Sequence, residues 1–222
     1  MLRRILLSCT LLSLVAAGPI LVAQTATQQH HPPESTGEYI KALEDPGRDA
    51  WQQPDLVIEN LGLHTGDEVA DLGAGSGYFT VRLAREVGPS GKVYAVDIDR
   101  KMLDYIERRA QEEKLDNIQT ILADPNDPKL GSQSVDLIFI CDVLHHIQDR
   151  DKYYPKLYRA LRPGGRLVNV DFQKRKLPLG PPLEMKIDKK DSIKEIEAAG
   201  FHFEKEFDFL KYQYFLVFAP EE

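Results

Sequence analysis

Cysteine is scarce in this chain of 222 residues, which contains only Cys9 and Cys141. Cys9 lies in an apolar N-terminal segment, so Cys141 has no partner once such a segment is removed. The sequence therefore excludes a disulfide framework and a cysteine-based metal site. The pair His30-His31 stands in a polar stretch beside two prolines, where histidines are normally solvated, and we expect no metal.

Basic residues are also in deficit. Lys and Arg number 28 against 35 Asp and Glu, which gives a formal net charge of −7. Proteins that bind nucleic acid normally present a basic face, so we expect no nucleic-acid partner. What the chain does contain is 42% hydrophobic residues, enough for one sizeable core. We therefore expect one domain with appendages.

The N-terminus has the pattern of a targeting segment. Arg3 and Arg4 precede an uncharged run over residues 5–23, which is typical of a signal peptide cleaved after Ala23. A run of this length also suits an uncleaved membrane anchor. Both alternatives predict a periplasmic, secreted or membrane-anchored domain, and a cytoplasmic one only if the segment is not functional. Residues 24–35 are expected to be a flexible linker, and 36–222 the folded domain.

Residues 69–80 read Val-Ala-Asp-Leu-Gly-Ala-Gly-Ser-Gly-Tyr-Phe-Thr, an apolar strand that runs through a glycine-rich turn into a helix. Alternate glycines let the backbone approach a ligand closely, and the helix that follows presents free N–H groups. Dinucleotide-binding turns need a third small residue where this chain has Tyr78, which argues against NAD or FAD. No Lys-Ser/Thr pair follows the turn, so a phosphate-binding P-loop is unsupported.

Alternating strand and helix patterns continue to the C-terminus, which indicates an α/β fold. Short helices are expected at 39–43 and from Pro54, with Trp51 between them. The other predicted strands are 93–96, 118–122, 135–140 and 166–170, the predicted helices are 78–87, 100–114, 151–161 and 191–200, and a terminal hairpin is predicted over 203–209 and 212–218.

Polar residues follow these strands, at the sheet edge where ligands of α/β proteins bind. Asp97 ends the strand 93–96, where a carboxylate can accept both ribose hydroxyls, and Asp99 suits a helix N-cap. Asp124 before Pro125 is either a turn residue or a ligand contact. The end of the strand 135–140 carries Cys141, His145 and His146, and we expect one of the two histidines on the catalytic side.

Taken together, these motifs and Leu-Arg-Pro-Gly-Gly at 161–165 resemble the class I S-adenosylmethionine (SAM)-dependent methyltransferases, of the type 11 or ubiquinone/menaquinone C-methyltransferase kind. The resemblance implies a doubly wound, Rossmann-like, mostly parallel seven-stranded sheet with an antiparallel C-terminal hairpin. It implies SAM as cofactor, with Asp97 at the ribose, His146 in preference to His145 at the acceptor, and Cys141 near the sulfonium. The methionine part is assigned to Asp71, Gly73, Ala74, Gly75, Ser76 and Gly77, and the adenine to Ile98, Asp124 and Pro125.

The resemblance also implies methyl transfer to a small-molecule or lipid-like acceptor by in-line displacement. Tyr39, Trp51 and Tyr78 are the candidate substrate contacts, and Trp51 either caps the core or closes over the cofactor. The basic stretch 173–190 is either a solvated loop or a contact for acidic substrates or lipid head groups. Two other functions stay open: a non-catalytic module that binds SAM or a nucleoside, and, less favoured, an NAD-dependent oxidoreductase.

Overall fold

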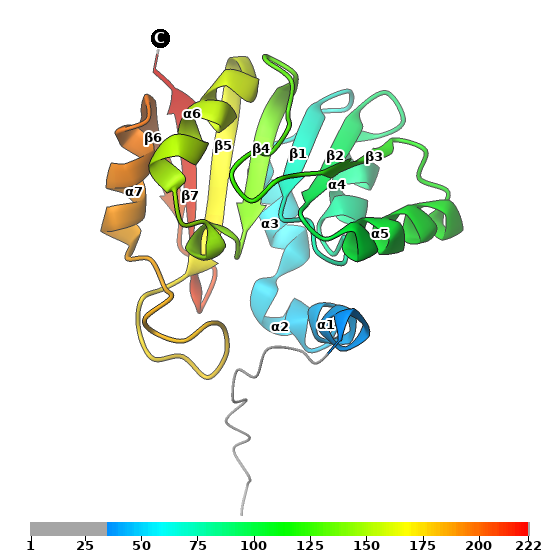
Figure 1. The fold of residues 1–222 in the computed structure, drawn as a ribbon, viewed down its shortest axis with the longest axis horizontal. Helices are drawn as coiled ribbons and strands as arrows, with labels where there is room; N and C mark the ends of the chain where they lie inside the picture. Colours follow the sequence, from blue (N-terminus) through cyan, green and yellow to red (C-terminus); the bar gives the residue numbers. More distant parts are fainter. Residues whose placement is uncertain (1–34, 222) are drawn as a thin grey trace, which may run out of the picture.

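Seven strands form one open sheet in the computed structural model, which describes residues 35–221 (Figure 1). Their order across the sheet is β3-β2-β1-β4-β5-β7-β6, and β7 runs antiparallel to both of its neighbours whereas β1 to β5 are parallel. The predicted fold class is therefore confirmed. The strands are β1 Glu68–Leu72, β2 Lys92–Asp97, β3 Ile118–Leu122, β4 Val135–Cys141, β5 Leu161–Phe172, β6 Phe201–Phe207 and β7 Gln213–Pro220.

Helices cover both faces of this sheet, with α6 and α7 in front and α3 and α4 behind in Figure 1. Successive residues of a strand point to opposite faces, so each strand contributes side chains to the cores on both faces of the sheet. In β4, Leu137 and Phe139 pack with α3 and α4, while Ile138 and Ile140 pack with α6. The helices are α1 Thr36–Leu43, α2 Arg48–Gln52, α3 Pro54–Leu61, α4 Thr80–Val87, α5 Arg100–Glu113, α6 Arg150–Ala160 and α7 Lys189–Glu197, with a 3₁₀ turn η1 at Leu144–His146.

The first helices differ from the prediction because of local capping. Helix α1 begins at Thr36, three residues earlier than expected, because the Ser35 side chain accepts a hydrogen bond from Glu38 N at 3.3 Å. Ser35 is thus an N-cap, although the sequence places it in the linker. Trp51 lies inside the short helix α2, where the sequence predicts a connection.

Later element boundaries also move. Helix α4 begins at Thr80, two residues after Tyr78, because the glycine-rich turn takes up more of the chain. Strand β5 begins at Leu161, so the predicted glycine turn lies within the strand, where the pairing with β4 is irregular. Helix α7 begins at Lys189, where the Asp188 side chain accepts from Lys190 N at 2.9 Å and caps it.

The strand order places two distant segments opposite each other. β1 and β4 are neighbours, although β2 and β3 lie between them in sequence, and such a reversal of strand order opens a crevice at the carboxyl edge. Gly73 after β1 has φ +71°, and a Cβ there would lie 2.3 Å from Val143 Cγ2 after β4. Only glycine fits this approach. Figure 1 shows α1, α2 and the connection 173–188 at the same edge.

The predicted signal or anchor segment lies outside the described residues, as does nearly all of the predicted linker. Export and the domain boundaries therefore stay predictions from the sequence. Between residues 35 and 221, no helix combines the length and the apolar character that crossing a bilayer requires.

Candidate active site

The glycine-rich turn is tied directly to Asp97. Gly75 N donates to Asp97 Oδ2 at 2.8 Å, and Asp99 N donates to Oδ1 at 2.9 Å. Burial raises the pKa of Asp97, although these backbone hydrogen bonds oppose the shift. Ile98 beside it is 62% exposed, an apolar side chain available to a flat ring. The structure thus brings together the turn, the carboxylate and the apolar wall that the sequence predicts.

The rest of the turn is packed against neighbouring helices. Ser76 is buried, and its hydroxyl donates to Glu44 Oε1 at 2.6 Å, which fastens the end of α1 to the turn. A Cβ on Gly75 would lie 3.1 Å from Leu43 Cδ1, so α1 covers the turn closely. Ala74 is buried, and Gly77 (φ +78°) leaves no room beside Ile106 of α5. In this part of the turn the ligand-facing groups are therefore backbone groups.

Asp71 lies beneath the turn. It is 3% exposed, and its Oδ2 accepts from the Thr80 hydroxyl at 2.6 Å, so the carboxylate joins the end of β1 to the start of α4. Burial raises the pKa of Asp71 to about 6, against the opposing hydrogen bond from Thr80. The sequence predicts a direct contact with the methionine part of the cofactor. In the structure the side chain supports the turn from inside, and its contact with the cofactor stays a prediction.

The raised pKa of Asp71 has a measurable consequence for stability. A carboxyl whose folded pKa lies above its unfolded value stabilises the fold when protonated, and this contribution is lost as pH rises through about 6. Asp71→Asn removes the titration but keeps an acceptor for Thr80. We expect its free energy of unfolding, relative to wild type, to increase by on the order of 3 kcal/mol between about pH 4 and pH 7. Urea denaturation at several pH values measures this, and a difference independent of pH contradicts it.

Asp124 lies next to Asp97, since Ala123 N donates to Asp97 O at 2.9 Å. The Asp124 carboxylate is 63% exposed and pairs with Lys129 Nζ at 3.1 Å, while its backbone pairs with that of Asp127. Pro125 is exposed in the same turn. The turn role is thus present in the structure, and contact with adenine stays a prediction.

His145 and Asp171 form a buried dyad between η1 and the end of β5. The imidazole Nδ1 lies 2.8 Å from Asp171 Oδ1 and 3.1 Å from Oδ2, and Phe172 N donates to Oδ1 at 2.7 Å. The side chains are 3% and 0% exposed. Burial lowers the pKa of His145, but the hydrogen bond and charge of Asp171 outweigh it, so the pKa is raised. A neutral His145 with its proton on Nδ1 has Nε2 free to accept a proton.

This geometry favours His145, whereas the sequence favours His146. His146 is exposed, and its ring stacks at a tilt against the ring of His145, with centroids 4.2 Å apart. The difference arises because η1 turns only the first of the two side chains toward the end of β5. Asp171 was not predicted from the sequence as a site residue, and its hydrogen bond with His145 favours His145 as the catalytic histidine.

A second unpredicted group is Asp142. It has φ +60°, a strained conformation for a non-glycine residue, and Gln213 Nε2 donates to its Oδ1 at 2.7 Å. Burial and the neighbouring charge of Asp171 raise the pKa of Asp142 to about 7. Gln52 Nε2 in turn donates to Gln213 Oε1 at 2.8 Å, so a buried amide chain fixes α2 over the ends of β4 and β7. The one signal in the sequence is that Asp142 directly follows an apolar strand.

Cys141 completes this end of β4. Its Sγ lies 3.6 Å from Gln52 Nε2, and burial raises the pKa of the thiol, with the charge of Asp142 adding to the shift. The thiol therefore stays neutral. A neutral thiol is a poor nucleophile, so this environment favours a packing role for Cys141 at the end of β4.

Tyr39 and Trp51 lie at this edge. Burial raises the pKa of the Tyr39 hydroxyl, and the negative charges of Asp97 and Asp142 add to the effect. The Trp51 ring lies 5.7 Å from the ring of Phe172 at the end of β5. Trp51 thus covers the edge above Phe172.

Tyr78, the third predicted substrate contact, lies between two helices beside the site. It is 5% exposed, its hydroxyl donates to Asp49, and its ring lies between the guanidinium groups of Arg48 and Arg82 at 4.0 and 4.2 Å. These contacts join α2 to α4. Tyr78 therefore positions the cover of the site, and its contact with the substrate stays a prediction.

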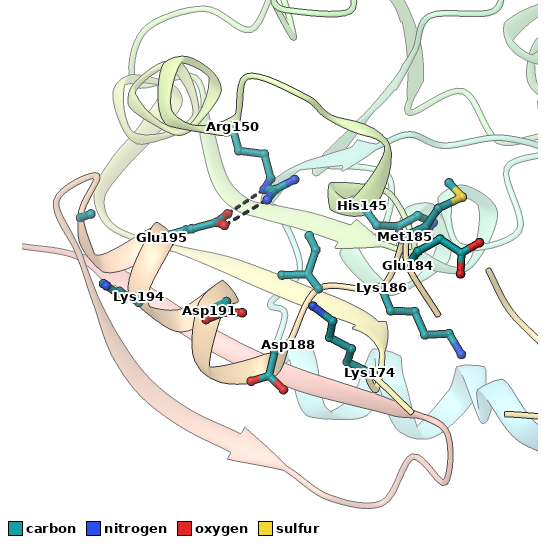
Figure 2. A pocket seen from close by; sticks show the side chains of 12 residues that line it. His145, Arg150, Lys174, Glu184, Met185, Lys186, Asp188, Asp191, Lys194 and Glu195 are labelled. Carbon is teal, nitrogen blue, oxygen red and sulfur yellow. Dashed lines mark hydrogen bonds and ion pairs between the residues drawn. The ribbon is translucent and has the colours of Figure 1, made fainter. Parts of the chain in front are cut away.

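A pocket of about 580 Å³ opens beside the dyad, between η1, α6, α7 and the connection 173–188 (Figure 2). Arg150 on its wall is paired with Glu195, with nitrogen–oxygen distances of 2.6 and 3.0 Å. Apolar surface comes from Met185 and Ile187. His145 thus connects the buried dyad to a cavity large enough for a small acceptor.

Comparison with known proteins finds a methyltransferase family model and methyltransferase relatives. The family model described as a methyltransferase domain matches residues 63–209, more than half of the chain. The ubiquinone/menaquinone biosynthesis C-methyltransferase UbiE of Hahella chejuensis is 33% identical over 130 residues, 58% of this chain and 51% of the relative. UbiE of Pasteurella multocida is 34% identical over 139 residues, 60% and 48% of the two chains. The chain thus spans about half the length of these curated relatives.

Solved structures agree with the family match. A SAM-dependent methyltransferase from Aquifex aeolicus is 28% identical, with a TM-score of 0.78 over 84% of this chain and 98% of that one. Phosphoethanolamine N-methyltransferase 2 of Haemonchus contortus, solved with SAM, is 18% identical and shares the fold, with a TM-score of 0.65 over 78% of this chain and 53% of that one. The chain therefore belongs to the methyltransferase domain family, and its fold is that of SAM-dependent methyltransferases.

Proposed function

We propose that this protein transfers the methyl group of SAM to a small-molecule or lipid-like acceptor. The observation that carries the proposal is the glycine-rich turn held to Asp97 at an edge that also gathers Asp142 and Asp171. SAM presents a positively charged sulfonium and an ammonium group, and nearby carboxylates stabilise both. The same negative charges repel the pyrophosphate of a dinucleotide, which disfavours the alternative of an NAD-dependent oxidoreductase.

The residues at the edge suit the parts of this cofactor. Asp97 has two carboxylate oxygens, each with lone-pair capacity left for a ribose hydroxyl after its backbone hydrogen bond. Ile98 offers an exposed apolar side chain to the adenine ring, with Asp124 in the neighbouring turn. Asp142 follows β4, and the neighbouring strand β5 carries Asp171 of the dyad, so we assign the sulfonium end of SAM to this side, with Tyr39 of α1 as a further candidate contact.

In the proposed mechanism, bound SAM supplies an electrophilic methyl group and a thioether leaving group. The protein contributes alignment and exclusion of water, through α1 over the turn and Trp51 over Phe172. His145 Nε2 accepts the proton of an acceptor hydroxyl, and Asp171 stabilises the imidazolium that results.

A lipid-like acceptor is supported by two observations. The pocket beside His145 includes Met185 and Ile187, and the aromatic pair Trp51 and Phe172 lies close to the dyad. The curated relatives described as ubiquinone/menaquinone biosynthesis C-methyltransferases suggest the same class. Because this chain spans about half of each, the acceptor is proposed only as a class.

The test begins with purified full-length protein. We expect SAM or S-adenosylhomocysteine (SAH) to co-purify and to be found by mass spectrometry after denaturation. The protein should then transfer a radiolabelled methyl group from SAM to a component of a small-molecule or lipid extract. Bound SAM without transfer to any acceptor favours a non-catalytic binding module. Tight NADH binding without SAM binding contradicts the proposal.

A further inference from the structure

Lys186 is a buried cation that the proposed mechanism does not use. It is 3% exposed, and its Nζ donates to Arg175 O at 3.0 Å. Within residues 35–221, the Lys186 ammonium makes no ion pair and no second hydrogen bond. An ammonium group has three donors, and burying it with one carbonyl acceptor is costly unless an anion joins it. Two donors are therefore available to a ligand.

The surroundings of Lys186 belong to the proposed site. Its Nζ lies 5.8 Å from the centre of the Phe172 ring, next in sequence to Asp171 of the dyad. The Phe172 ring also contacts Trp51, and Gly180 packs so closely that a Cβ there would lie 2.7 Å from the ring. The loop that carries Lys186 is thus fixed against the end of β5.

Lys186 and His145 also line the same pocket, Lys186 from the connection 173–188 and His145 from η1. Asp171 acts on Lys186 only through its charge and makes no ion pair with it among the described residues; its oxygens are instead directed to His145 and Phe172 N. Burial lowers the pKa of Lys186, and the positive charge of Arg175 adds to the shift while Asp171 opposes it. An additional negative group is the missing partner.

We propose that Lys186 binds an anionic oxygen of the methyl acceptor, so that the acceptor carries an acidic hydroxyl or a carboxylate beside an apolar ring or chain. This inference rests on the proposed function. With a hydroxyl acceptor, the O–H bond breaks, His145 Nε2 takes the proton, and the electron pair stays on the oxygen beside Lys186. With SAM bound, this oxygen would form a bond to the methyl carbon while the sulfur–methyl bond breaks, its electron pair would go to sulfur, and SAH would leave. A carboxylate needs no proton transfer. Amine acceptors are disfavoured, because Lys186 repels a protonated amine.

Ionisation of a bound phenol tests the proposal without turnover. The probe is 4-nitrophenol, whose phenolate absorbs visible light, added to the full-length protein with and without SAH. We expect wild type to lower the pKa of the bound phenol by about one unit, a tenfold shift in its ionisation. Lys186→Met should abolish the shift, and Lys186→Arg should retain most of it. Lys176→Met, an exposed lysine of the same loop, is the matched control and should behave as wild type.

Benzoate separates the two acceptor chemistries. If benzoate displaces the phenol from wild type, and its affinity is about tenfold weaker for Lys186→Met, the result supports a carboxylate acceptor. If benzoate does not displace the phenol from wild type, the result supports an acidic hydroxyl. The proposal is overturned if wild type leaves the ionisation of 4-nitrophenol unchanged, or if Lys186→Met shifts it as wild type does. Calorimetry with SAM on the same proteins keeps the two inferences apart. SAM binding without a phenol shift overturns only the role of Lys186, whereas no SAM binding contradicts the proposed function.

Discussion

Asp97→Ala is expected to weaken SAM binding at least about 100-fold in calorimetry while the protein stays folded. The carboxylate accepts from Gly75 N and Asp99 N, and in the proposed complex it also accepts the ribose hydroxyls. Hydrogen bonds to a charged acceptor contribute about 1.5–3 kcal/mol each, and about 1.4 kcal/mol corresponds to a tenfold change in affinity. Loss of the ribose contacts and of the fixed turn together accounts for the expected effect.

Asp99→Ala is the matched control for this experiment. Asp99 lies two residues away and caps α5 by accepting from Lys101 N at 2.8 Å. Removing it should lower stability by about 1 kcal/mol and leave SAM affinity within a few-fold of wild type. Thermal denaturation of both variants separates loss of binding from loss of folding. If the Asp97→Ala protein binds SAM as tightly as the Asp99→Ala protein, the proposal that Asp97 binds the ribose is contradicted.

His145→Ala is expected to lower kcat about 100-fold or more with an acceptor that must lose a proton, while SAM affinity stays near that of wild type. Positioned general bases typically contribute a factor of this size. His146→Ala is the control, and because His146 is exposed its kcat should change little. Equal losses in the two variants, or an unchanged rate in His145→Ala, would demote the dyad to a structural feature.

The dyad also predicts a direction for the pH dependence. A base must be neutral to accept a proton, so kcat should rise with pH through the pKa of His145, which Asp171 holds above the ordinary imidazole value. Asp171→Asn removes the charge that stabilises the imidazolium. The rising limb of the kcat profile should therefore move to lower pH, while the maximum rate falls because the ring is less well oriented. A rising limb at the same pH in both proteins contradicts the assignment.

Much of the fold follows from local patterns in the sequence. Apolar runs such as 135–140 are long enough for buried parallel strands, and glycines and caps mark where helices begin and end. Asp97 was predictable for the same reason, since a residue that directly ends a parallel strand lies at the carboxyl edge whatever the rest of the chain does. The glycine-rich turn required glycine for its backbone, and the structure shows Gly73 against Val143.

Side-chain direction at the strand ends was not predictable in this way. Asp71 and Asp97 both lie at ends of parallel strands, yet Asp71 turns inward to Thr80 and Asp97 turns to Gly75. Which face a terminal residue takes depends on how the following helix packs. For this reason the sequence could place Asp71 at the ligand edge but could not show that its carboxylate bonds Thr80 and supports the turn; its contact with the cofactor stays a prediction.

By itself the sequence determined the order of the elements, the turn and the strand end that meets it, because these depend on periodicity and backbone conformation within short segments. Only the tertiary structure decided the rest of the site. Gln52 meets Gln213 across 161 positions, and His145 meets Asp171 across 26, because β5 lies between β4 and β7 in the sheet. Lys186 is buried for the same kind of reason: its loop folds back onto Phe172, and no local pattern encodes that contact.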